Sequence, residues 1–246
     1  MDRAAFYASL RRKDSGVFGT SLSESQVNGM EGILDAFATH GDGRAKTLAY
    51  ALATAYHEVG GRMVPVREGF ASSDAAARRI VRNRTYGKPA GPYGHVYYGR
   101  GLVQLTWLDN YKRSSADAGV DLVKDPDKAL DPVIGARILI KGLIDGRWNG
   151  RGKGIAFYLP DGGPDDLKNA RRTVNITDKW QSIAGYYKAF LAAIKTAGGV
   201  PGKPVQTHKP VPPVVAEPAT PEPRPAPSQG GLWALFASIL KKLAGG

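Results

Sequence analysis

Hydrophobic residues in the first 198 positions recur mostly at helical spacing. Ser23 and Gln26 have the form of a capping box, which predicts that a helix begins there. The apolar residues that follow at helical intervals are Val27, Met30, Leu34 and Phe37. A second helix is predicted over Arg44–Val59, and Gly60-Gly61 would end it. Its apolar stripe consists of Ala45, Leu48, Leu52, Ala55 and Val59.

The same spacing predicts two later helices, over Pro132–Leu143 and Thr177–Ala197, with a glycine-rich loop between them. Strand signals are short, and the best candidates are Tyr97-Tyr98 and Val103–Thr106. The pattern therefore predicts a mainly α-helical domain over residues 1–198.

Composition changes abruptly near Gly198. Residues 199–230 are rich in proline, which cannot donate the hydrogen bonds of a helix or sheet, so a flexible, extended linker is predicted. Residues 231–246 then form a basic amphipathic pattern that is too short to span a bilayer and is typical of a membrane interface. A helix that docks on the domain or on a partner is the alternative. The residues predicted to bind an anionic membrane are Leu232, Trp233, Leu235, Phe236, Ile239, Leu240, Lys241 and Lys242.

The formal net charge of +12 indicates an anionic partner, such as nucleic acid, anionic lipid or an acidic cell-wall polymer. The chain has no cysteine, which excludes disulfides, zinc–thiolate sites and cysteine nucleophiles. Charged residues return at Arg11, Arg12 and Lys13, so we expect no secretory signal and synthesis in the cytoplasm.

Glu58 is the first candidate for chemistry. It falls at the edge of the predicted apolar stripe, and its small flank of Thr47, Ala51 and Thr54 would leave room for a ligand. Partial burial and the negative end of the helix dipole both disfavour an ionised carboxylate, which suits a general acid. A solvated glutamate at the helix end is the alternative.

The neighbouring His57 begins an incomplete zinc motif, because Gly61 stands where HExxH requires its second histidine. We therefore expect no metal and no cofactor, and we place His57 as a hydrogen-bonding group in the core or beside the substrate. Glu68 lies on a loop that can fold back toward Glu58, and two carboxyl groups in different settings are the minimum for glycoside hydrolysis. An ion pair between Glu68 and Arg67, or another basic group, is the alternative.

The segment 97–111 combines aromatic, amide, hydroxyl and guanidinium side chains between glycines. Aromatic faces stack on sugar rings, while amides and hydroxyls bond to sugar hydroxyls, so the segment favours a carbohydrate groove over a plain aromatic hairpin. Its candidate residues are Tyr98, Arg100, Gln104, Thr106, Trp107, Asn110 and Tyr111.

Three motifs resemble those of family 19 glycoside hydrolases, which include chitinases and phage and bacterial endolysins. Tyr98-Gly99-Arg100-Gly101, with Gln104-Leu105-Thr106 and Asn110-Tyr111, resembles the family signature. Tyr56-His57-Glu58 with Gly60-Gly61 looks like the family's helix end, and 170–175 resembles its later motif. The resemblance covers roughly residues 22–191, with the motifs in the family's order.

The resemblance implies a mainly α, lysozyme-like bilobal fold and an inverting mechanism. By this resemblance Glu58 matches the general acid, and Thr106 matches the hydroxyl that helps hold the attacking water. Glu68 is the candidate general base, at a spacing that looks like the endolysin branch. Gln104, Asn110 and Tyr111 match substrate-groove positions, and Arg172 and Asn175 match positions that line the cleft from the other lobe.

We therefore expect a monomeric endolysin that hydrolyses β-1,4 bonds in the glycan strands of peptidoglycan and acts at the cell wall after release. The alternatives are a chitinase of the same family and, in another class, a non-catalytic wall-binding or membrane-permeabilising protein. A nucleic-acid partner is not expected, because the aromatic residues cluster with glycines and amides rather than with Lys and Arg.

Overall fold

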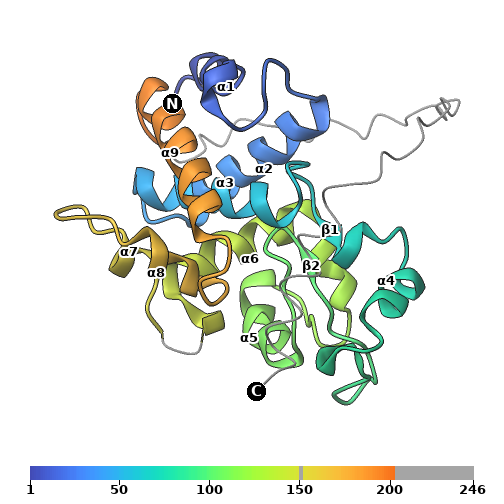
Figure 1. The fold of residues 1–246 in the computed structure, drawn as a ribbon. Coiled ribbons are helices and arrows are strands. Elements are labelled where there is room, and N and C mark those ends of the chain that lie inside the picture. Colours follow the sequence, from blue (N-terminus) through green and yellow to red (C-terminus); the bar gives the residue numbers. More distant parts are fainter. Residues whose placement is uncertain (150–151, 203–246) are drawn as a thin grey trace, which may run out of the picture. The chain divides into compact units, whose positions relative to one another are not determined.

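The computed structural model describes residues 1–149 and 152–202, and this part of the chain is mainly helical, as predicted (Figure 1). The predicted linker and the predicted C-terminal amphipathic helix lie outside the described residues, except for 199–202. The α-helices are α1 (Arg3–Leu10), α2 (Glu24–His40), α3 (Ala45–Glu58), α4 (Asp74–Val81), α5 (Leu108–Ala118), α6 (Pro132–Asp145), α7 (Ile155–Tyr158), α8 (Leu167–Ala170) and α9 (Trp180–Thr196). Short 3₁₀ helices cover Lys13–Ser15, Glu68–Phe70, Thr85–Gly87, Pro126–Leu130, Arg147–Asn149 and Arg171–Thr173.

The capping box at the start of α2 is confirmed. The Ser23 hydroxyl accepts a hydrogen bond from the Gln26 N–H, and the Gln26 side-chain oxygen accepts one from the Ser23 N–H. The Gln26 amide also donates to the Gly61 carbonyl at 2.9 Å. The start of α2 is thereby tied to the end of α3, where the candidate acid lies.

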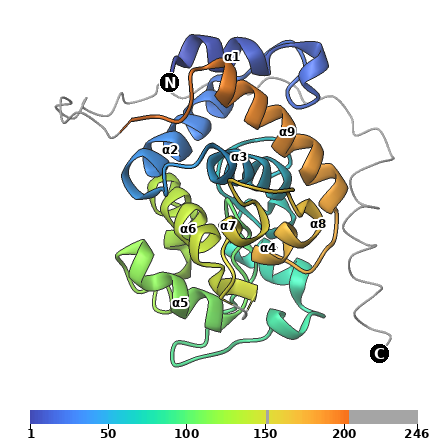
Figure 2. The same ribbon diagram turned by 90° about the vertical axis from the view of Figure 1, so that its left-hand side faces the viewer.

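The helix predicted over Arg44–Val59 is confirmed as α3, and Figure 2 shows it between α2 and α9. One expectation about it is wrong. Thr47, Ala51 and Thr54, the small flank that was to leave room for a ligand, are completely buried. Because α9, α6 and α2 all pack against α3, small side chains on this flank serve close helix packing rather than an open groove.

The end of α3 is set by Gly60 and Gly61, both of which adopt positive φ, at 58° and 76°. A left-handed backbone favours glycine and ends the helix. The Gly61 N–H donates to the Tyr56 carbonyl at 2.7 Å, which satisfies one carbonyl of the last turn. The chain then turns away from the helix axis into the loop that carries Glu68.

The strand predictions are wrong in position. The structure pairs β1 (Val66–Arg67) with β2 (Arg100–Gly101) in an antiparallel ladder, and the segments predicted as strands lie on either side of β2. After β2 the chain reverses at once, because Arg100 and Leu105 exchange backbone hydrogen bonds of 2.8 and 3.1 Å. Gly101 and Gln104 both have positive φ inside this turn, which an extended strand through Gln104 would not allow.

Two hydrophobic clusters divide the described residues into a large and a small lobe. The large cluster draws on α1, α2, α3, α5, α6 and α9. The small cluster contains Ala77, Val81, Val96 and Tyr98, and therefore joins α4 to the segment before β2. Figure 1 shows α4 on the side of β1 and away from α9. This division fits the bilobal fold that the resemblance implied.

The later helices agree with the sequence except at their ends and in the loop. The helix predicted over Pro132–Leu143 extends to Asp145 as α6, and the one predicted over Thr177–Ala197 begins only at Trp180 as α9. The predicted loop between them contains α7 and α8, and α1, α4 and α5 were not predicted. Within the described residues, no helix has the length and apolar character that crossing a bilayer requires.

Candidate active site

Glu58 is the last residue of α3, and its carboxylate lies 2.8 Å from the guanidinium of Arg171. The side chains of Glu58 and Arg171 are 15% and 3% exposed, respectively. A buried pair of this kind attracts more strongly than one in water, because little solvent separates the charges. Burial and the helix dipole at Glu58 can be expected from the sequence, but this cation comes from a distant segment and cannot.

Arg171 is therefore a functional candidate that the sequence analysis missed. Its Nε–H donates to the Asp178 carbonyl at 3.2 Å, which holds the guanidinium against the segment before α9. The signal was present in the motif at 170–175, where two arginines stand side by side. The family resemblance implied Arg172 instead, but the Nε–H of Arg172 donates to the Asn169 side chain at 2.8 Å.

His57 precedes Glu58 and is half-buried near the ring of Tyr186. Burial lowers the pKa of His57, so the ring is neutral near pH 7. No group of three or more metal-ligating side chains occurs among residues 1–149 and 152–202.

Glu68 follows β1 directly and is held against Gly99, which directly precedes β2. The Gly99 N–H donates to Glu68 Oε2 at 2.8 Å, and the Tyr86 hydroxyl donates to Glu68 Oε1 at 2.6 Å. The Glu68 N–H also donates to the Gly99 carbonyl at 2.7 Å. Both carboxylate oxygens accept hydrogen bonds, as suits an ionised carboxylate. The predicted ion pair between Glu68 and Arg67 is wrong, since Arg67 pairs with Asp127 instead.

Tyr86 is a second residue that the sequence analysis missed, because no spacing rule connects it to Glu68. Burial, together with the charge of Glu68, raises the pKa of Tyr86. The phenol therefore stays protonated and remains a hydrogen-bond donor to the carboxylate. Its ring meets the exposed ring of Trp107 edge to face, with 5.4 Å between the ring centroids.

Glycine is needed at position 99 because two side chains crowd its Cα. A Cβ there would lie 2.8 Å from Gln104 Oε1 and 3.3 Å from Glu68 Oε2. The Gln104 amide cannot easily move aside, since it donates to the backbone carbonyls of Val66 and Gly101 at 3.0 and 3.1 Å. Gln104, predicted to bind substrate, thus braces the turn with its amide hydrogens, and its side-chain oxygen lies against Gly99.

Thr106 lies just after this turn, half-buried, and its hydroxyl donates to the Gln104 carbonyl at 2.8 Å. Since the hydroxyl hydrogen is used in that bond, the oxygen is left to accept a hydrogen bond, for example from a water molecule. Asn110 supports it by donating to the Thr106 carbonyl at 2.9 Å.

Three residues predicted to contact substrate are buried beneath the segment instead. Arg100 is 1% exposed, and Tyr98 and Tyr111 are fully buried. The Arg100 guanidinium lies 3.5 Å from the centroid of the Tyr98 ring, and the Tyr111 hydroxyl donates to the Tyr98 carbonyl at 2.7 Å. These side chains support the turn from inside, so the prediction of direct substrate contact is corrected for all three.

The charge of Arg100 is balanced by two aspartates. Its guanidinium lies 2.7 Å from Asp127 and 3.2 Å from Asp74. Burial disfavours the ionised form of Asp127, but hydrogen bonds from Arg67 and Arg100 outweigh it and lower the pKa of Asp127. Because Arg67 lies in β1 and Arg100 in β2, Asp127 links the two strands that position Glu68.

Trp107 and Asn175 are the predicted substrate-binding residues with the most exposed positions. Trp107 is 48% exposed and has a positive φ of 75°, a conformation that costs a large side chain of order 1–3 kcal/mol. Such strain persists only where the surrounding structure enforces it. Asn175 is exposed two residues after the Arg171–Thr173 turn, and its side-chain oxygen accepts a hydrogen bond from the Ile176 N–H at 2.8 Å.

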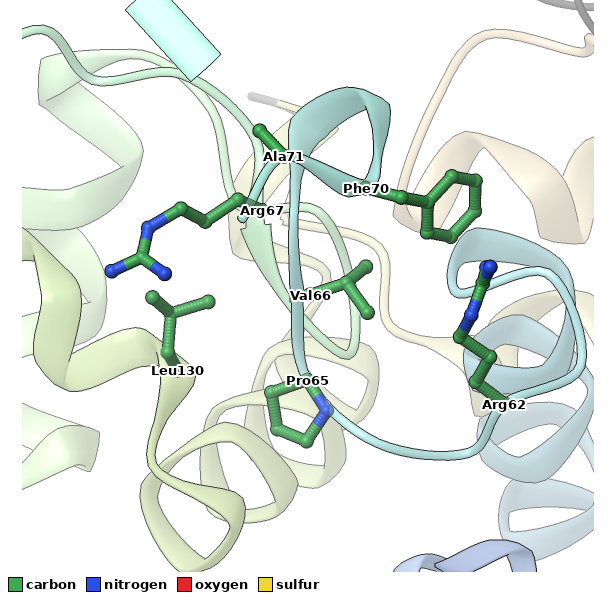
Figure 3. Close-up of a pocket in the computed structure, with 7 residues that line it drawn as sticks. All are labelled: Arg62, Pro65, Val66, Arg67, Phe70, Ala71 and Leu130. Atoms are coloured by element: carbon green, nitrogen blue, oxygen red, sulfur yellow. The ribbon is translucent and has the colours of Figure 1, made fainter. Parts of the chain in front are cut away.

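A cavity of about 270 Å³ opens on the loop that joins Glu58 to Glu68 (Figure 3). Neither glutamate is part of its lining. The lining residues are Arg62, Pro65, Val66, Arg67, Phe70, Ala71 and Leu130.

Residues 23–141 match the model of the family described as chitinase class I. The chain is 28% identical over 225 residues to Chitinase 11 of Oryza sativa subsp. japonica, across 80% of this chain and 82% of that protein. It is 37% identical over 108 residues to Endochitinase 1 of Theobroma cacao, and there it spans only 33% of the relative's length.

Solved structures of bacterial chitinases are also similar. Chitinase C from Streptomyces griseus HUT6037 shares 23% identity, with 73% of this chain and 78% of that chain covered and a TM-score of 0.46. A bacterial family 19 chitinase shares 24% identity, with 82% of this chain and 96% of that chain covered and a TM-score of 0.48. By the family model, residues 23–141, which include Glu58, Glu68 and Thr106, belong to glycoside hydrolase family 19, and the protein is a chitinase-like hydrolase.

Proposed function

We propose that the protein is an inverting hydrolase of β-1,4 bonds in polymers that contain N-acetylglucosamine, with the glycan strands of peptidoglycan as its substrate. One observation carries the proposal. Two glutamates at the ends of a single loop have different partners, because Glu58 contacts the guanidinium of Arg171 and Glu68 accepts two hydrogen bonds. Two carboxyl groups with different environments can divide the acid and base roles.

In the proposed reaction, Glu58 carries a proton and transfers it to the glycosidic oxygen as the bond from that oxygen to the anomeric carbon breaks. Arg171 then stabilises the carboxylate that remains on Glu58. Glu68 takes a proton from the water that attacks the anomeric carbon from the opposite face, and the Thr106 oxygen accepts that water's second hydrogen. An inverting arrangement requires roughly 6.5–9.5 Å between the two carboxyl groups to accommodate the water.

The choice of peptidoglycan over chitin rests on charge. The net charge of +12 suits a substrate that is anionic, and chitin is neutral whereas peptidoglycan carries carboxylates. The curated relatives are called chitinases, so chitin is the second candidate.

The deciding experiment incubates the purified protein and Glu58→Gln with peptidoglycan and with chitin, and identifies the products by mass spectrometry. We expect glycan fragments from peptidoglycan with the wild type and none with Glu58→Gln, whose circular dichroism should be unchanged. Products from chitin alone would make chitin the substrate in place of peptidoglycan, and full activity of Glu58→Gln would refute the mechanism. The anomeric form of the first product, read by NMR, tests inversion.

A further inference from the structure

The cavity on the loop between the two glutamates has a lining whose chemistry suits an anion. Arg62 and Arg67 contribute two cations, and no carboxylate lines it. Figure 3 shows Arg62 and Phe70 on one side of Val66, and Arg67 and Leu130 on the other. Asp127 offsets the charge of Arg67 from outside the lining, so Arg62 provides the cation that remains for a ligand.

Within residues 1–149 and 152–202, the guanidinium of Arg62 is held in place without donating a hydrogen bond. Its guanidinium lies over the ring of Phe70, 4.0 Å from the centroid, and the side chain is exposed. Among the described residues, no carboxylate pairs with Arg62. Stacking fixes the plane of a guanidinium while its N–H edge stays available for a carboxylate.

The wall that carries Arg62 is built by a strained loop. Phe70 has a positive φ of 57°, which is unfavourable for an aromatic residue. The ring of Phe70 reaches the end of α3, because a Cβ on Gly60 would lie 3.0 Å from its tip. Glycine at position 60 thus makes room for the aromatic platform beneath Arg62.

The size and position of the cavity select a side group rather than a sugar chain. A volume of about 270 Å³ lies below the usual range of sites that enclose a whole ligand. The cavity also lies on the loop that runs from Glu58 to Glu68, so a group bound there would hang from a sugar near the bond that is cut. In peptidoglycan, such carboxylates are carried by the stem peptide, or by the lactyl group of muramic acid where the peptide has been removed, and chitin has no counterpart.

We propose that this cavity binds a carboxylate on the muramyl side chain of peptidoglycan through Arg62, and that it selects peptidoglycan over chitin. This inference rests on the proposed function. The test compares wild type, Arg62→Gln and Arg79→Gln, the last removing an exposed arginine of α4 outside the cavity. The substrates are glycan strands with stem peptides, the same strands after amidase treatment, and chitin hexasaccharide.

We expect Arg62→Gln to lower the ratio of kcat/KM for strands to kcat/KM for chitin hexasaccharide by about three- to tenfold, mainly through KM. Arg79→Gln should keep the wild-type ratio. Amidase treatment removes the stem peptide and frees the lactyl carboxylate. If the effect of Arg62→Gln disappears after this treatment, the bound carboxylate belongs to the stem peptide, and if it persists, Arg62 also accepts the freed lactyl carboxylate. An equal loss on both polymers, or no loss, would overturn the inference.

A binding measurement separates this inference from the proposed function. Muramyl dipeptide and N-acetylmuramic acid are titrated into the protein by NMR, with di-N-acetylchitobiose as the neutral ligand. Binding of a muramyl ligand that weakens in Arg62→Gln supports the cavity even if the wild type does not cleave peptidoglycan. Cleavage of peptidoglycan without preferential binding of the muramyl ligands would refute the proposed role of the cavity, while the proposed hydrolase function would stand.

Discussion

Arg171 contacts the carboxylate of Glu58 at 2.8 Å, although 113 positions separate the two residues in the chain. The contact joins the end of α3 to the turn that precedes α9, and α3 and α9 pack along each other. The position of the candidate acid therefore depends on the central helix pair of the large lobe.

Replacing Arg171 with Met should destabilise the protein and lower its activity. The substitution removes the cation and leaves a largely buried carboxylate without a partner. A fully buried pair would cost about 3–5 kcal/mol, and the partial exposure of Glu58 reduces our expectation to about 2–3 kcal/mol. Urea unfolding measures the loss. Arg172→Met is the matched control, and an equal loss of stability in both variants would contradict a special role for the pair.

Gly99→Ala should impair catalysis more than stability. The added Cβ would press on Gln104 Oε1 and Glu68 Oε2, which shifts the candidate base. We expect kcat to fall at least tenfold, about 1.4 kcal/mol in activation free energy. Gly32→Ala in α2 is the control, because a Cβ there has open space around it and alanine favours a helix. Wild-type kcat in Gly99→Ala would show that Glu68 tolerates displacement.

Tyr86→Phe tests whether the hydrogen bond to Glu68 positions this carboxylate. A bond to a charged group contributes about 1.5–3 kcal/mol, so kcat should fall by roughly 10- to 100-fold while KM changes little. The pH dependence of kcat should also move, which loss of packing alone would not cause. The exposed Tyr93 provides the control, Tyr93→Phe. An unchanged pH profile in Tyr86→Phe would show that Tyr86 contributes packing and does not position Glu68.

Asp127 makes part of the stability depend on pH. Its pKa is lower in the folded protein than the ordinary value of 3.8. An aspartate with a lowered pKa contributes stability that is complete above its unfolded pKa and is lost as the pH falls through the folded one. The free energy of unfolding of wild type should therefore exceed that of Asp127→Asn at pH 7, and the gap should narrow below about pH 4. A gap that is the same at pH 7 and pH 3 would refute this linkage.

Removal of residues 231–246 tests the amphipathic segment, which the structure does not describe. We expect the truncated protein to lose sedimentation with vesicles of anionic lipid while glycan hydrolysis is retained. Vesicles of neutral lipid serve as the control for charge. Undiminished binding of the truncated protein to anionic vesicles would show that another part of the chain binds the membrane.

The features that the sequence predicts best depend on neighbouring residues. The capping box of Ser23 and Gln26 and the glycine stop after α3 involve bonds that span a few positions, and both are confirmed. The strand prediction for the aromatic segment is wrong because Arg100 and Leu105 bond to each other across a turn, which the short strand signals do not reveal. Burial of Tyr98 and Tyr111 follows from tertiary packing that no local pattern encodes.

For the candidate site, too, local sequence patterns predict only part of the arrangement. Glu58 and Glu68 were identified from their places relative to a helix end and a loop. Their partners Arg171 and Tyr86 come from distant segments, so only the folded chain brings them together.

The exchange of hydrogen bonds between Glu68 and Gly99 has a mechanical consequence. It fastens the candidate base to the turn that leads to Thr106, whereas Glu58 is held by Arg171, in the turn that precedes α9. Were these two turns to shift relative to each other, the distance between the two carboxyl groups would change, while Glu68 and Thr106 would keep their positions around the nucleophilic water. When substrates of different size bind, only Glu58, the proton donor, would then change its position relative to the water.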